Sequence, residues 1–232
     1  MTESDIPATL MSHVRENLKP VRPLASPALR LLALAPLAAL LLLGPALYYG
    51  WRTNLALLPG WAGFGLSFAE SVGGAALLGL ALRQSVPGLA VPARWILLSI
   101  AAAAAMFATV SLITTQVLPT PQVPSGWSRL EWECVVMELL FAVPSIAISA
   151  WLVARALPTR PALTGAAYGM AVGLMTDAGV RLFCWIDAPS HVFAAHGGAI
   201  LLGVLGGAAI AAGVERIKYR RLNVIRSNAA NA

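Results

Sequence analysis

The stretch of this chain that is richest in reactive and titratable side chains is RLFCWIDAPSHVFAAH, residues 181–196. It places the thiol of Cys184 close to the carboxylate of Asp187 and to the imidazoles of His191 and His196. Thiolates and imidazoles are the ligands that soft and borderline metal ions prefer. The stretch also joins two apolar segments, where titratable groups point to function. We therefore treat it as a candidate metal-binding or redox site.

The chain has two cysteines, and both fall at the same end of the predicted helices. Cys134 begins the fourth apolar segment and Cys184 ends the fifth, and the short turn at residues 155–161 would bring these ends together. The thiols would form a disulfide if their α-carbons came within about 7 Å, would bind a metal ion, or would pack as small hydrophobic groups. The candidate supporting ligands are His191, His196, Asp187 and Glu131.

The spacing of the two histidines argues against a simple metal motif. His191 and His196 are five residues apart, so a regular helix would separate them by about 140°. Both would face one ion only if the helix start were distorted. Otherwise one histidine is a ligand or pH-sensitive group and the other packs. Asp187 and Ser190 also suit an ordinary turn with a helix N-cap.

The composition is that of an integral membrane protein. Hydrophobic residues make up 58% of the 232 residues, charged residues 11%, and the mean hydropathy is +0.75. Six apolar segments have roughly the 20 residues that a spanning helix needs. They are residues 29–49, 59–82, 95–118, 132–154, 162–183 and 191–214. The sequence thus predicts an all-α polytopic bundle of six transmembrane helices, with the first segment kept as an anchor.

The basic residues predict how the bundle is oriented. Only Arg52, Arg129 and Arg181 fall on one side of the predicted membrane, and the other thirteen of the 16 Lys and Arg residues fall on the opposite side. The positive-inside rule then places both termini in the cytoplasm. This gives a cytoplasmic segment at 1–28, a transmembrane domain at 29–214 and a basic cytoplasmic tail at 215–232. The net charge of +6 is explained by topology and anionic lipid, without direct nucleic-acid binding.

Several acidic residues interrupt the apolar segments. Glu138 shares a helical face with Cys134, and Asp177 has the i, i+4 spacing of an ion pair with Arg181. With Glu70 and the histidines, these carboxylates could line an ion or proton path, so a small transporter is the rival class. No inverted repeat supports it. The chain also lacks C-x-x-C, Walker and hydrolase motifs, so we expect no enzyme activity.

The polar N-terminal segment contains one short amphipathic pattern. Leu10, Val14 and Leu18 recur at four-residue spacing within residues 7–18. Such a helix would lie on the membrane or dock into a groove of a partner. The alternative is a disordered tail.

The sequence resembles the bacterial membrane anti-sigma factors called negative regulator of sigma F over nearly its whole length. The resemblance rests on ENLKPVRPL before the first segment, Cys134 followed by Pro144, PTRPALTGAAYG at the fifth segment, and RLFCWIDAPSHVFAAH. It implies six helices in the inner membrane and a cytoplasmic N-terminal segment that helps to hold an extracytoplasmic-function sigma factor. It also implies that Cys134 and Cys184 are the sensing thiols for heavy metals or oxidants, with a transient metal ion and no constitutive cofactor. Besides an anti-sigma factor and a transporter, the third functional class is a purely structural membrane subunit.

Overall fold

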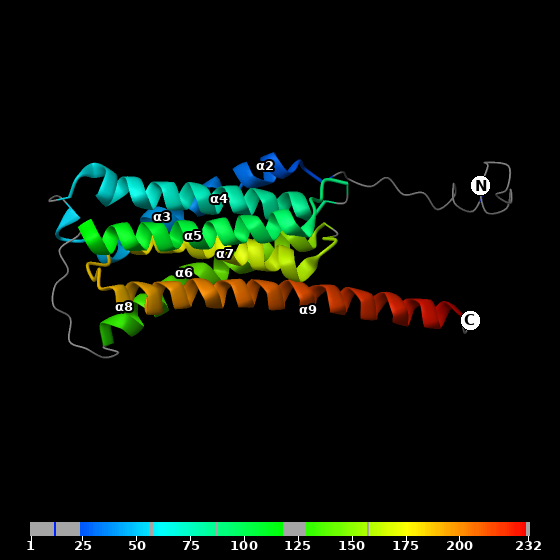
Figure 1. Ribbon diagram of the computed structural model, residues 1–232. Helices are drawn as coiled ribbons and strands as arrows, with labels where there is room; N and C mark the ends of the chain where they lie inside the picture. Colours follow the sequence, from blue (N-terminus) through cyan, green and yellow to red (C-terminus); the bar gives the residue numbers. More distant parts are fainter. Residues whose placement is uncertain are drawn as a thin grey trace.

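The computed structural model describes residues 24–55, 58–86, 88–117, 129–156 and 158–230, together with Ser12. The candidate partner-binding residues Leu10, Val14 and Leu18 lie outside the described residues, so their role stays a prediction. The regular secondary structure of the described part is all helical, with no strand. It forms a bundle of six helical segments, as the sequence predicts (Figure 1).

The elements follow the predicted segments with shifted boundaries. They are α2 (Pro27–Leu32), α3 (Ala35–Tyr49), η3 (Trp61–Gly65), α4 (Leu66–Gln84), α5 (Ala93–Val117), α6 (Arg129–Ala154), α7 (Pro161–Val180), α8 (Pro189–His191), η4 (Val192–His196) and α9 (Gly197–Ala230). The first segment is broken between α2 and α3 because Pro36 has no N–H to donate and its ring collides with the preceding turn. The last helix continues to Ala230, through the predicted tail, and extends past the other helices (Figure 1).

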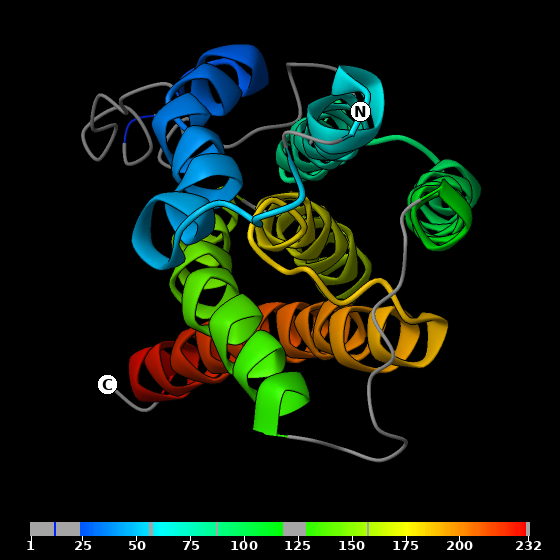
Figure 2. The ribbon, with the colours of Figure 1, turned by 90° about the vertical axis from the view of Figure 1, so that its left-hand side faces the viewer.

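α7 is the central helix of the bundle. In the end-on view of Figure 2 the other helices surround it, and residues 167–180 are all buried. Five segments are long and apolar enough to cross a membrane, and α7 is not among them. The reason is its surroundings: a helix covered by protein on all sides need not be apolar, so α7 can carry Tyr168 and Asp177.

Glycines allow α7 and α9 to pack backbone against backbone. A Cβ atom at Gly169 would collide with the carbonyl oxygen of Gly203, and one at Gly165 would collide with that of Gly207. The two glycines of each helix are four residues apart, which is the small-xxx-small pattern of membrane helix contacts. The hydroxyl of Tyr168 donates to the Gly207 carbonyl at 2.9 Å. The relative position of α7 and α9 is therefore tightly fixed.

Polar contacts define two ends of the bundle, which we call the thiol end and the basic end. At the basic end, Lys218 donates to the carbonyl of Ala154 at 2.7 Å. Arg30 donates to the Ser85 hydroxyl at 3.2 Å and to the Leu152 carbonyl. The thiol end holds Cys134, Cys184 and the polypeptide around them.

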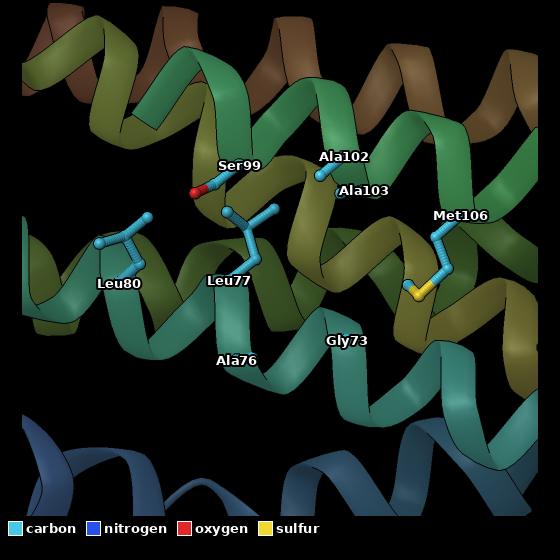
Figure 3. Close-up of a pocket in the computed structure, with 8 residues that line it drawn as sticks. All are labelled: Gly73, Ala76, Leu77, Leu80, Ser99, Ala102, Ala103 and Met106. Atoms are coloured by element: carbon cyan, nitrogen blue, oxygen red, sulfur yellow. The ribbon is translucent and has the colours of Figure 1, made fainter. Parts of the chain in front are cut away.

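A groove of about 420 Å³ opens between α4 and α5, away from the thiols (Figure 3). Its lining is apolar except for Ser99, and it contains no titratable group. A Cβ atom at Gly73 would meet the Met106 sulfur at 2.7 Å, so a larger residue there would have to displace the end of the Met106 side chain. This groove offers no chemistry, so the search for a site turns to the thiol end.

Candidate functional site

The structure brings the two cysteines into contact at the thiol end. Cys134 comes from the second turn of α6, and Cys184 from the loop after α7. Their Sγ atoms are 3.5 Å apart. Both residues are buried, in a small apolar cluster with Val180 and Ile186. The sequence-based expectation that the outer ends of these two segments meet thus agrees with the geometry.

Both histidines join the thiols. His191 Nε2 lies 3.4 Å from the Sγ atom of Cys184, and the Nε2 atoms of His191 and His196 are 3.2 Å apart. One ligand atom from each of Cys134, Cys184, His191 and His196 lies within 4.8 Å of every other. We call these four residues the thiol–imidazole cluster.

A local helix distortion makes this convergence possible. η4 is a π-helical turn in which the N–H of Gly197 reaches the carbonyl of Val192, five residues back. A π turn is wider than an α turn, so residues five apart come onto one side instead of diverging by about 140°. The distortion that the spacing of His191 and His196 required is therefore present.

A carboxylate on another helix orients the second histidine. Asp177 Oδ1 lies 2.6 Å from His196 Nδ1, so the Nε2 atom of His196 is left to face the cluster. The predicted pair with Arg181 is also present, since Arg181 Nε donates to Asp177 Oδ2 at 2.6 Å. From the sequence we expected Asp177 in that pair or in an ion path, and not as the partner of His196 beside the thiols. A carboxylate behind a ligating imidazole is the usual outer partner in a metal site.

Asp187 serves the loop rather than the cluster. Its carboxylate accepts two hydrogen bonds from Arg52, at 2.6 and 3.3 Å, in a buried ion pair. Burial raises the pKa of the Asp187 carboxyl above its ordinary value, and the Arg52 guanidinium opposes that rise. The backbone N–H of Arg52 also donates to the Leu182 carbonyl at 3.0 Å. Arg52 therefore clamps the loop that carries Cys184. The side chain of Glu131, the other carboxylate that we expected near the thiols, lies outside the described part.

A pocket of about 370 Å³ leads to the thiols. Its lining includes Cys134 and Cys184 together with Tyr49 and Met137. The pocket gives a small ion or oxidant a route to the otherwise buried sulfur atoms.

The donor set and its spacing suit a thiophilic metal ion. A tetrahedral zinc site with bonds of about 2.0–2.3 Å has ligand atoms roughly 3.3–3.8 Å apart. Three of the six donor pairs here are 3.5, 3.4 and 3.2 Å apart, and the other three are within 4.8 Å. Two sulfur and two imidazole nitrogen donors are typical of Zn²⁺ and similar ions. The same thiols are also placed for oxidation to a disulfide.

The fold and the site define a polytopic helical membrane protein with a thiol–imidazole cluster at one end of its bundle. A family model described as negative regulator of sigma F matches residues 15–216. The chain therefore belongs to the negative regulator of sigma F family. Comparison with curated proteins and with solved structures gave no match.

Proposed function

We propose that this protein is a membrane anti-sigma factor that holds an extracytoplasmic-function sigma factor in the cytoplasm and releases it under heavy-metal or oxidative stress. Membership of the negative regulator of sigma F family supports the regulatory, non-enzymatic part of this proposal. The observation that carries the sensing part is the convergence of two thiols and two imidazoles within 4.8 Å. The signal is metal binding at this cluster or oxidation of its cysteines.

The proposal places the thiol end outside the cytoplasm and the basic end inside it. The positive-inside rule supports this orientation, and so does the clustering of Arg30 and Lys218 contacts at the end opposite the thiols. The membrane is then the bacterial inner membrane. The sensor faces the side from which metal ions and oxidants arrive, and the sigma factor binds on the other side.

α6 connects the two ends. It carries Cys134 near its start, and its final carbonyls accept hydrogen bonds from Arg30 of α2, at Leu152, and from Lys218 of α9, at Ala154. When a ligand draws Cys134 toward Cys184 and the histidines, the far end of α6 moves against these two side chains. α2 follows directly after the N-terminal segment that is proposed to hold the sigma factor. Through this route, a displacement at the thiols reaches the N-terminal segment that is proposed to bind the sigma factor.

The test is purification of the full-length protein from its native membrane, with mass spectrometry of what copurifies. We expect a sigma factor to copurify, to leave when Cd²⁺ is added, and to stay bound to the Cys134→Ser/Cys184→Ser variant. Absence of any sigma factor would contradict the anti-sigma function. Release of the sigma factor from the serine variant would contradict only the thiol sensor.

A second pair of variants tests the route through α6. Arg30→Met removes both hydrogen bonds that Arg30 makes, including the one to the Leu152 carbonyl of α6, so we expect it to retain the sigma factor after Cd²⁺ is added. Arg83→Met is the control, because Arg83 lies at the same end but, among the described residues, donates to the exposed carbonyl of Leu89 and to no residue of α6. If Arg30→Met still releases the sigma factor at the wild-type Cd²⁺ concentration, the contact between α6 and Arg30 is not the route. Ion flux in proteoliposomes would instead support the transporter class.

A further inference from the structure

A group of buried charges lies directly beneath the thiol–imidazole cluster. Glu70 of α4, Glu138 of α6 and Asp177 of α7 lie near Arg181, the residue that follows α7, and all four are at most 7% exposed. Three carboxylates share one guanidinium, so when all three are ionised and His196 is neutral, two negative charges have no counter-charge. A buried charge needs a partner or it is strongly unfavourable. The group therefore calls for two protons or one divalent cation.

Glu138 shows where that positive charge is needed. It is 1% exposed, and neither of its carboxylate oxygens has a hydrogen-bond partner. Arg181 does not reach it: the Arg181 Nε atom donates to Asp177 at 2.6 Å and lies 3.2 Å from Glu70 Oε2. Instead, a carboxylate oxygen of Glu138 lies within 4.8 Å of ligand atoms on Asp177 and His196. These three residues come from three different segments, α6, α7 and η4.

We propose that Glu138, Asp177 and His196 form a second cation site, which binds a first-row divalent ion such as Mn²⁺. Two carboxylates and one imidazole are harder ligands than thiolates, and they suit Mn²⁺ better than the soft metal ions that thiols prefer. The ion supplies the two missing positive charges. It takes the place of the two protons that would otherwise neutralise the carboxylates, so two protons are released per ion bound. The imidazole proton of His196 moves from Nδ1, which lies 2.6 Å from Asp177 Oδ1, to Nε2.

His196 links this second site to the thiol–imidazole cluster. Its Nε2 atom is 3.2 Å from His191 in the cluster, and its Nδ1 atom is bonded to Asp177 in the second site. An ion in the second site therefore restrains the imidazole that the cluster uses. The inference does not depend on the anti-sigma function, because it concerns ion binding alone.

The experiment is Mn²⁺ titration of the full-length protein in detergent, followed by electron paramagnetic resonance. The Cys134→Ser/Cys184→Ser variant is used throughout, so that thiolates contribute nothing. We expect one bound Mn²⁺ per chain, and a loss of affinity of at least about tenfold in the added Glu138→Gln substitution. Glutamine has the shape of glutamate and breaks no hydrogen bond here, so the fold should persist, which circular dichroism checks.

Glu215→Gln is the matched control, because Glu215 lies on α9 toward the basic end, and we expect it to bind Mn²⁺ as the parent does. Equal affinity in the Glu138→Gln and parent proteins would overturn the proposal. So would the absence of any specifically bound Mn²⁺ in the parent, which would mean that two protons neutralise the carboxylates.

Discussion

The contact between α7 and α9 predicts opposite behaviour for two adjacent glycines. A Cβ atom at Gly207 would collide with the carbonyl oxygen of Gly165 and lie 3.1 Å from the ring of Tyr168, whereas one at Gly206 meets nothing within 4 Å. The Gly165 carbonyl belongs to a backbone that cannot rotate away, so alanine at 207 must push the helices apart. Overpacking of this kind costs about 1–3 kcal/mol. The shift also strains the hydrogen bond from Tyr168 to the Gly207 carbonyl.

The paired design separates packing from backbone effects. Both Gly207→Ala and Gly206→Ala gain about 1 kcal/mol of helix propensity, so the difference between them reports the collision. We expect Gly206→Ala to be neutral or slightly stabilising and Gly207→Ala to be less stable than it by about 1–3 kcal/mol. The measurement is unfolding of the detergent-solubilised protein in sodium dodecyl sulfate, followed by circular dichroism. Equal stabilities of the two variants would refute the close backbone packing.

Three further predictions concern the thiol end. Diamide should convert Cys134 and Cys184 of the folded protein into an intramolecular disulfide, seen as faster migration on a non-reducing gel; two free thiols after prolonged treatment would contradict their contact. Arg52→Ala leaves the Asp187 carboxylate buried without its partner, so it should lower the free energy of unfolding by about 3–5 kcal/mol and speed alkylation of Cys184. Arg52→Ala/Asp187→Ala should restore part of the stability, and an unchanged alkylation rate in Arg52→Ala would contradict the clamp. Asp177→Asn should lower Cd²⁺ affinity about 10–100-fold although it removes no donor of the cluster, as measured by competition with a chelating dye; wild-type affinity would contradict its orienting role.

The membrane architecture could be predicted because it depends on composition and length alone. Apolar segments of spanning length must become helices in a bilayer, since no other local structure satisfies their backbone groups. The i, i+4 pair of Asp177 and Arg181 was equally local, and the structure contains it. These features need no knowledge of which helices are neighbours.

The contacts of the site could not be predicted because they depend on which helices meet. Arg52 and Asp187 are 135 residues apart, and no local pattern pairs them. The partner of His196 is Asp177, on a different helix, and the π turn that turns both histidines to one side has no sequence signal that we could recognise. The central position of α7 was also hidden, although its glycines at four-residue spacing were a usable sign of close packing.

In the proposed sensing mechanism, the restraints around the thiol–imidazole cluster decide which element responds to a ligand. α7 and α9 are held together by backbone contacts at Gly169 and Gly203, so the start of α9 cannot shift freely relative to the end of α7. The loop with Cys184 is fixed by the ion pair of Arg52. A ligand that draws the four donors closer therefore acts against two rigid supports and one helix, α6, which contains Pro144. Since a proline removes one hydrogen bond from the helix interior, α6 is the element that yields, and it is also the one whose far end reaches Arg30 and Lys218.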